Sequence, residues 1–295
     1  MPAFTVVTLF LLAGAICAVW APAVGAGRLK IAPWVVLALA AAGCGLLAGV
    51  LQVAGLAALL ALAGAAALSA SHPRYAVRLV AGVVTAVLAL ALATHRLPGF
   101  DNPLLLQGVV LSNGAAPFTQ YANLDKGAVG LILLALLCQR LHSWLDAGAM
   151  LRRAWPVMAI TLVAVFGAAL GLGLVRPEFK LSALTLQFIA VNLFFTVVAE
   201  EAFFRSLLQQ PLSTALARFS AGKWLALVVS ALLFGAVHLG GGPLYALLAL
   251  IAGLGYAWVY QRTGRIEAAI VLHIVVNALH FIAFTYPYLL KAPGA

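Results

Sequence analysis

The sequence predicts an all-α protein, a polytopic transmembrane helical bundle, from its composition and from the lengths of its apolar runs. Hydrophobic residues make up 65% of the 295-residue chain and charged residues only 8%, and the mean hydropathy is +1.12. A soluble globular protein has about 25% charged residues. This chain cannot cover its surface in water, so lipid must surround most of it.

Ten apolar runs are long enough to form helical spans, each of which needs about 20 mainly apolar residues. A count of nine is also possible, because no charged residue separates the second run from the third around residue 51. Residues 95–126 form the longest polar stretch and are expected to be a loop. The runs lie near residues 3–24, 31–50, 52–70, 78–94, 127–142, 155–175, 183–205, 223–239, 243–261 and 266–285.

The chain carries a formal charge of +10, which in a soluble protein would suggest nucleic acid as a partner. Here the basic residues lie in short clusters between apolar runs, a pattern typical of loops that face anionic lipid. We therefore expect the lipid bilayer as a partner, no nucleic acid, and a multi-pass protein of the cell membrane.

Two adjacent carboxylates, Glu200 and Glu201, lie inside the apolar run QFIAVNLFFTVVAEEAFF. The other five acidic residues, Asp125 among them, lie in loops or at span ends, where water can reach them. A charge at membrane depth is costly, so a carboxylate there indicates a functional site by default. Glu201 lies four residues before Arg205, on the same helix face, where the two can form an ion pair. Glu200 points about 100° away and has no cation at helical spacing, so we expect an unpaired carboxylate that can act as a general base.

Polar residues also lie in two later apolar runs. His238 closes an apolar helix one turn after Phe234, just before the helix-ending residues 240–243. His273 and Asn277 are four residues apart in IEAAIVLHIVVNALH, so they share one face of the last span. A lone histidine in an apolar helix is usually a packing residue, but two such helices together with a carboxylate helix favour a joint polar site.

These residue types allow two kinds of chemistry. A glutamate and a histidine together can activate a water molecule, while histidine and asparagine donate hydrogen bonds to a developing oxyanion. Alternatively, Glu200, His238 and His273 could bind zinc, which would then polarise the water. The sequence contains no HExxH motif, and spacing alone leaves both mechanisms open.

Three motifs follow one another on successive apolar helices: Glu200-Glu201-x-x-x-Arg205, Phe234-x-x-x-His238 and His273-x-x-x-Asn277. Their order resembles that of the CPBP (Abi-like) family of intramembrane proteases, which groups type II CAAX prenyl endopeptidases with bacteriocin-processing proteins. The stretch GLGYAWVYQRTGRIEAAIVLHIVVN also looks like that family. The resemblance covers roughly residues 155–285.

The resemblance implies an intramembrane endopeptidase, a CAAX-protease-like enzyme of the glutamic type without a metal cofactor, that cleaves a membrane-associated protein or peptide. Zinc stays the alternative cofactor. Carried over by position, Glu200 and His238 would activate the water. The oxyanion would be stabilised by His273 and Asn277. The supporting residues would be Glu201, Arg205 and Phe234.

The resemblance also divides the chain. Residues 1–126 would be N-terminal transmembrane segments and an outer loop of unknown role, and residues 127–295 would form the catalytic membrane core. The extra N-terminal spans and the Ala/Gly-rich composition look bacterial, so we expect the inner membrane of a bacterium. A non-catalytic bacteriocin-immunity or scaffold protein of the same fold is an alternative. A transporter is another, because intramembrane ionisable groups also mark ion and proton paths, although the chain shows no inverted repeat.

Helix geometry sets a condition on this site. At a rise of about 1.5 Å per residue, Glu200 lies roughly 25 Å from a helix start at residue 183. His238 lies roughly 22 Å from a helix start at residue 223, on a span that runs in the opposite direction. For both residues to act on one water molecule, tilt, a broken helix or a different boundary must bring them to one depth.

Overall fold

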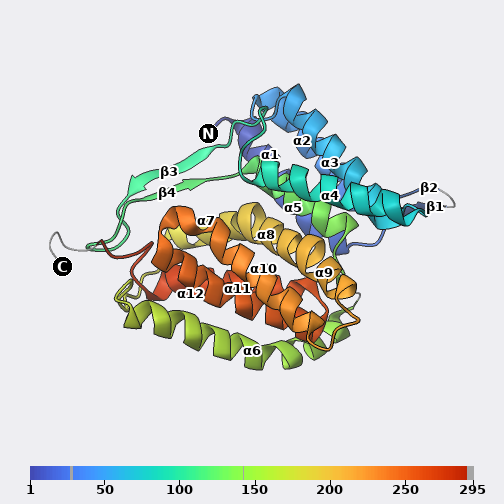
Figure 1. The fold of residues 1–295 in the computed structure, drawn as a ribbon. Helices are drawn as coiled ribbons and strands as arrows, with labels where there is room; N and C mark the ends of the chain where they lie inside the picture. Colours follow the sequence, from blue (N-terminus) through green and yellow to red (C-terminus); the bar gives the residue numbers. More distant parts are fainter. Residues whose placement is uncertain (27–28, 142, 291–295) are drawn as a thin grey trace. The chain divides into compact units, whose positions relative to one another are not determined.

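The computed structural model describes residues 1–26, 29–141 and 143–290, and most of these residues are helical (Figure 1). The all-α prediction is confirmed. The chain divides into two compact units, each of which is made of several chain segments. Unit 1 consists of Met1–Pro103, Tyr121–Arg140 and Phe194–Leu207, and unit 2 consists of Leu104–Gln120, Leu141–Leu193 and Leu208–Ala295. These units are defined by compactness, so the division into an N-terminal part and a catalytic core stays a prediction.

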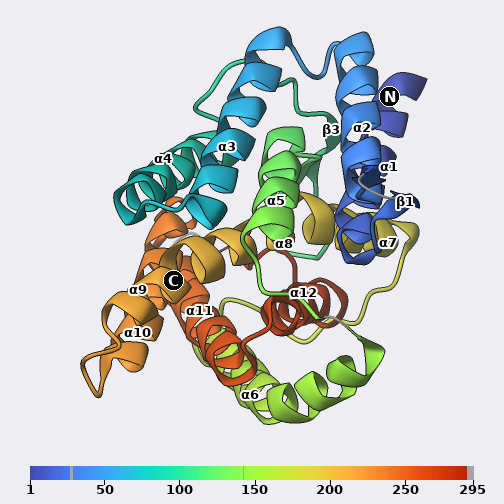
Figure 2. The ribbon, with the colours of Figure 1, turned by 90° about the vertical axis from the view of Figure 1, so that its right-hand side faces the viewer.

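Unit 1 is a group of helices around a short central one. Its elements are α1 (Ala3–Cys17), β1 (Val24–Ala26), β2 (Leu29–Ile31), α2 (Pro33–Ala48), α3 (Val53–Ser71), α4 (Tyr75–Ala93), α5 (Leu124–Leu136) and α8 (Val198–Glu201). The central helix is α5, which contacts α1, α3, α4 and α8 (Figure 2). Most of its residues are buried, and Leu133 of α5 belongs to one apolar cluster with Leu62 of α3 and Ala202.

Unit 2 is a second helical group. Its elements are β3 (Leu104–Val109), β4 (Phe118–Tyr121, of which Tyr121 belongs to unit 1), α6 (Trp144–Gly171), α7 (Ala183–Asn192), α9 (Gln210–Ala215), α10 (Gly222–Val237), α11 (Pro243–Thr263) and α12 (Ile266–Ala283). The central helix is α11, which contacts α6, α10 and α12. It can approach α6 closely because a Cβ atom at Gly255 would lie only 2.2 Å from Oγ1 of Thr161, and small residues allow such contacts between membrane helices.

Membrane-spanning helices are present in both units. Among the described residues, seven helices are long and apolar enough to cross a membrane. All ten predicted runs form helices, but α2 and α10 have 16 residues each and α5 has 13. At about 1.5 Å per residue these three are shorter than a hydrocarbon core of about 30 Å. Leu60 of α3 is 63% exposed and Val87 of α4 is 61% exposed, as expected of side chains that face lipid. The polytopic membrane bundle is therefore confirmed.

Local sequence signals set the helix boundaries that were hardest to predict. Gly49 ends α2 in the left-handed conformation, with a φ of 74°, so the second and third runs are separate helices. A capping box of Ser182 and Thr185 begins α7 at Ala183, and α10 begins at Gly222. The predicted starts near residues 183 and 223 are confirmed, so the depths predicted for Glu200 and His238 do not differ because of a misplaced boundary.

The polar stretch 95–126 differs from a simple loop. The strands β3 and β4 pair within it, and its last residues form the first turn of α5. Asp125 is consequently buried, with 1% of its surface exposed. The expectation that water reaches this carboxylate was wrong, because α5 begins three residues before the predicted run.

Candidate functional site

Glu200 and Glu201 lie on a helix of irregular geometry. They end α8, an α-helical turn between two π-helical segments, Leu193–Val197 and Ala202–Gln209. The whole helix runs from Ala183 to Ala215. Turns of the π type are rare and occur frequently at functional sites. Because a π-helical turn is wider than an α-helical one, side-chain directions along this helix depart from regular α-helical spacing.

The predicted ion pair between Glu201 and Arg205 is confirmed. Arg205 donates from Nε to Oε2 of Glu201 at 2.9 Å, and both side chains are fully buried. Breaking a buried ion pair by removing one partner is strongly destabilising. This geometry is that of a structural pair, and the supporting role of the two residues in catalysis stays a prediction.

Glu200 is also paired, so the expectation of an unpaired carboxylate was wrong. Lys126 of α5 donates from Nζ to Oε1 of Glu200 at 2.6 Å, and the two side chains are only 16% and 15% exposed. An ammonium group this close stabilises the negative charge of the carboxylate. Helical spacing could not reveal this cation, because it lies 74 residues earlier, on a different helix. The available signal was a lysine at the start of an apolar run.

The ring of His238 is oriented by the helix that precedes it. Its Nδ1 lies 2.7 Å from the backbone oxygen of Phe234, one turn earlier. A carbonyl oxygen only accepts hydrogen bonds, so Nδ1 must carry the proton and Nε2 holds the lone pair of the neutral ring. The glycines and proline at 240–243 end the helix here, which leaves His238 half-buried. Nε2 is therefore the ring atom of His238 that can accept a proton.

Two aromatic rings contact His238 and His273, which both belong to unit 2. The ring centroid of Phe234 lies 4.7 Å from that of His238 and 5.8 Å from that of His273. Tyr256 of α11 stacks on His273, with 4.4 Å between centroids and 17° between planes. His273 is only 5% exposed, so these contacts restrict its ring. Tyr256 was not predicted as a site residue, although it lies in the family-like stretch GLGYAWVYQRTG.

Asn277 lies one turn after His273 on α12, as its spacing predicted. Its Nδ2 donates to Oδ1 of Asn192 at 2.7 Å. An amide nitrogen has two N–H donors, and this bond uses one of them. Asn192 was missed at the sequence level, where its signal is a single amide inside the apolar run QFIAVNLFF.

The candidate residues divide between the two units. Glu200, Glu201 and Arg205 belong to unit 1, whereas unit 2 contains Phe234, His238, His273 and Asn277. The approach of Glu200 to His238 therefore stays a prediction. Within the part of the chain that the structure describes, no group of three or more His, Cys, Asp or Glu side chains is arranged to hold a metal ion. The zinc alternative also stays a prediction.

Comparison with known families gives a match over the region that carries the three motifs. The model of the family described as type II CAAX prenyl endopeptidase Rce1-like matches residues 182–279. Residues 182–279 are similar to that family, and we call them the Rce1-like domain. No curated protein and no solved structure matches the chain.

The Rce1-like domain confirms the resemblance that the motifs predicted, and all seven candidate residues lie inside it. It covers about a third of the chain, so α1 to α6 lie outside it. Together with the apolar helices, the domain supports a multi-pass membrane protein with the general activity of an intramembrane protease of the CAAX type.

Proposed function

We propose that this chain is an intramembrane endopeptidase that hydrolyses a peptide bond of a membrane-associated protein or peptide. The observation that carries the proposal is the state of His238 within the Rce1-like domain. Its Nδ1–H bond to the oxygen of Phe234 leaves Nε2 to accept a proton. The same domain contains Glu200, a carboxylate that can share this task, and His273 and Asn277, which can donate hydrogen bonds.

Glu200 and His238 activate a water molecule. These two residues take a proton from the water as its oxygen attacks the carbonyl carbon of the scissile peptide bond. The carbonyl oxygen gains negative charge, and His273 and the second N–H of the Asn277 amide donate hydrogen bonds to it. The C–N bond then breaks, and the proton passes to the leaving amine. The products are one new carboxyl group and one new amino group.

We propose that this reaction uses no metal cofactor. The ammonium group of Lys126 lies against Oε1 of Glu200, and a divalent cation bound to the same carboxylate would be repelled by it. Chelators should therefore leave the activity of the purified protein unchanged. Loss of activity in a chelator, followed by recovery with added zinc, would instead support a zinc site made of Glu200, His238 and His273.

The test compares Glu200→Gln and His238→Ala with the unaltered chain in membranes that contain a membrane-anchored reporter peptide. His72→Ala is the matched control, because His72 lies at the end of α3 and has no proposed role. We expect new reporter termini, detected by mass spectrometry, with the unaltered chain and with His72→Ala, and none with the other two variants. Full cleavage by either variant would overturn the proposal.

The same variants separate the enzyme from a non-catalytic immunity or scaffold protein. Membrane-protein termini should differ between cells with and without the gene, and Glu200→Gln should remove that difference. If Glu200→Gln leaves both the termini and any bacteriocin immunity unchanged, the non-catalytic alternative is favoured.

A bacterial inner membrane is the proposed location.

A further inference from the structure

Lys126 lies outside the Rce1-like domain, yet its ammonium group contacts the carboxylate that we propose as general base. A lysine that is mostly buried in a membrane protein is costly and normally pairs with an opposite charge or marks a functional site. Lys126 can neutralise Glu200, and it can also hold the carboxylate in place if its own position is fixed by its neighbours.

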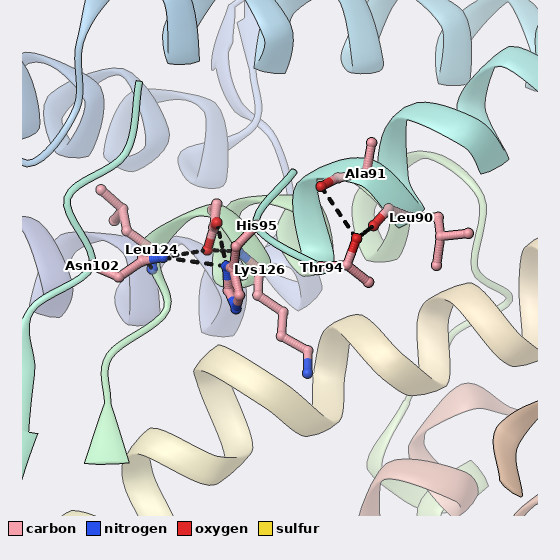
Figure 3. Close-up of polar contacts among 8 residues, drawn as sticks. Leu90, Ala91, Thr94, His95, Asn102, Leu124 and Lys126 are labelled. Carbon is pink, nitrogen blue, oxygen red and sulfur yellow. Dashed lines mark hydrogen bonds and ion pairs between the residues drawn. The ribbon is translucent and has the colours of Figure 1, made fainter. Parts of the chain in front are cut away.

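The first turn of α5 is fixed by a network of hydrogen bonds (Figure 3). Asp125 accepts from Nδ1 of His95 at 2.6 Å and from Nδ2 of Asn102 at 3.1 Å. Its Oδ1 also accepts from the backbone nitrogen of Lys126 at 2.8 Å. Asn102 in turn accepts from the backbone nitrogen of Leu124 at 2.7 Å. Leu124 and Asp125 are thus held from outside the helix, and Asp125 in turn holds the backbone of Lys126, so the base of the Lys126 side chain has little freedom.

His95 occupies a backbone position that normally favours glycine. It follows the last turn of α4 with a φ of 58°. Its backbone nitrogen donates to the carbonyl of Leu92, and that of Arg96 donates to the carbonyl of Ala91. These two bonds form a Schellman motif, which usually has glycine at the position of His95. Thr94 closes the same turn by donating to Leu90 (Figure 3). A residue with a side chain is strained in this conformation. Its ring must therefore contribute something that glycine lacks, and the ring is what bonds Asp125.

Close packing brings α5 to the helix of Glu200. A Cβ atom at Gly127 would lie 2.7 Å from Cδ1 of Phe195, and one at Gly130 would lie 3.0 Å from the backbone nitrogen of Ala199. Glycine at these two positions, three residues apart on one face, allows the helices to approach. The short separation lets the Lys126 side chain reach Glu200 with its base held rigid.

From these contacts we infer that Lys126 is a positioning residue, which holds the Glu200 carboxylate charged and in one orientation, and that His95, Asn102 and Asp125 hold Lys126. This inference rests on the proposed function, because it assigns Lys126 a task in the same site. It also gives the connection between α4 and α5 a role. Lys126 itself does not contact the substrate.

The kinetic test uses Lys126→Met and Lys126→Arg in the full chain, with Lys180→Met as the matched control. Lys180 is a lysine of unit 2 with a similarly buried side chain, 18% exposed, paired with Glu178. We expect kcat to fall on the order of 100-fold in Lys126→Met, as misplacement of a catalytic group by about 1 Å would cause, with KM unchanged. Lys126→Arg should recover most of kcat, and Lys180→Met should retain it. An unchanged kcat in Lys126→Met, or a raised KM alone, would overturn the inference.

A thermal-unfolding cycle in detergent micelles tests the pair without any activity. Lys126→Met removes the ammonium group that contacts a mostly buried carboxylate, so it should lower Tm, and the double variant Lys126→Met/Glu200→Gln should regain part of that loss. If Lys126→Met does not accumulate, the double variant should. If the two substitutions lower Tm additively, or if the double variant does not accumulate either, a direct pair of Lys126 and Glu200 is contradicted.

The proposed function and the positioning role of Lys126 can be refuted separately. Full activity of Glu200→Gln would overturn the proposed function, whereas the unfolding cycle would still report on the pair. An inactive Glu200→Gln together with a fully active Lys126→Met would leave the proposed function intact and overturn the positioning role of Lys126.

Discussion

Replacement of each of the two adjacent glutamates in turn should give opposite phenotypes. Glu201→Ala removes the carboxylate that pairs with Arg205, whose side chain is fully buried. Breaking such a pair costs about 3–5 kcal/mol of unfolding free energy. Glu200→Gln removes the negative charge opposite Lys126 but keeps an oxygen that can accept from its ammonium group, so it should cost about 1–3 kcal/mol. Glu201→Ala should therefore impair stability more than Glu200→Gln does.

Activity should show the reverse order. Glu200→Gln should abolish cleavage although most of the protein stays folded, whereas the folded fraction of Glu201→Ala should keep a measurable kcat. The assay combines denaturant unfolding in micelles with cleavage of a reporter peptide, normalised to folded protein. Glu178→Ala is the control, because its carboxylate is 35% exposed and lies 3.9 Å from Lys180, a long and partly exposed pair whose loss should cost about 1 kcal/mol or less. Equal stability losses at positions 200 and 201, or retained cleavage in Glu200→Gln, would refute this reasoning.

Three further substitutions test the packing and the second contacts of the site. Gly255→Ala should cost about 1–3 kcal/mol through overpacking against Thr161, whereas Gly167→Ala, where a Cβ meets nothing within 4 Å, should leave the unfolding free energy unchanged or raised. Tyr256→Leu should lower kcat about tenfold, because it removes the ring that stacks on His273. Tyr256→Phe keeps an aromatic ring and should leave kcat unchanged. His95→Gly should relieve the strained φ and keep Tm, yet lower kcat about tenfold; an unchanged kcat would leave the ring without a role.

The features predicted correctly from the sequence are those that depend on neighbouring residues. Composition and run length located all ten helices, and Gly49 and the capping box at Ser182 acted as local boundary signals. The pair of Glu201 and Arg205 followed from a spacing of four residues. Hydropathy placed the end of α5 too late, because apolar residues continue to Cys138. The helix ends at Leu136, where Arg140 donates to the free carbonyls of Leu134 and Ala135 in the last turn.

The features that were missed depend on contacts between helices. Lys126 and Glu200 are 74 residues apart, and Asn192 and Asn277 are 85 residues apart. Helical periodicity identifies which side chains share a face, but it does not identify which other helix that face meets. The π-helical turns beside Glu200 were missed for a related reason, because their sequence is as apolar as that of a regular span and the departure arises from packing.

The pair of Lys126 and Glu200 also bears on how the chain is divided. The predicted boundary after residue 126 places Lys126 in the N-terminal part and Glu200 in the catalytic core. If Lys126 holds Glu200, the core depends on a residue of the N-terminal part, because breaking a mostly buried ion pair is destabilising. A related protein that keeps the three motifs but has no lysine at this position should then provide a cation from another helix. A relative with full activity and no such cation would show that Glu200 can work without one, and the N-terminal part would again need a different explanation.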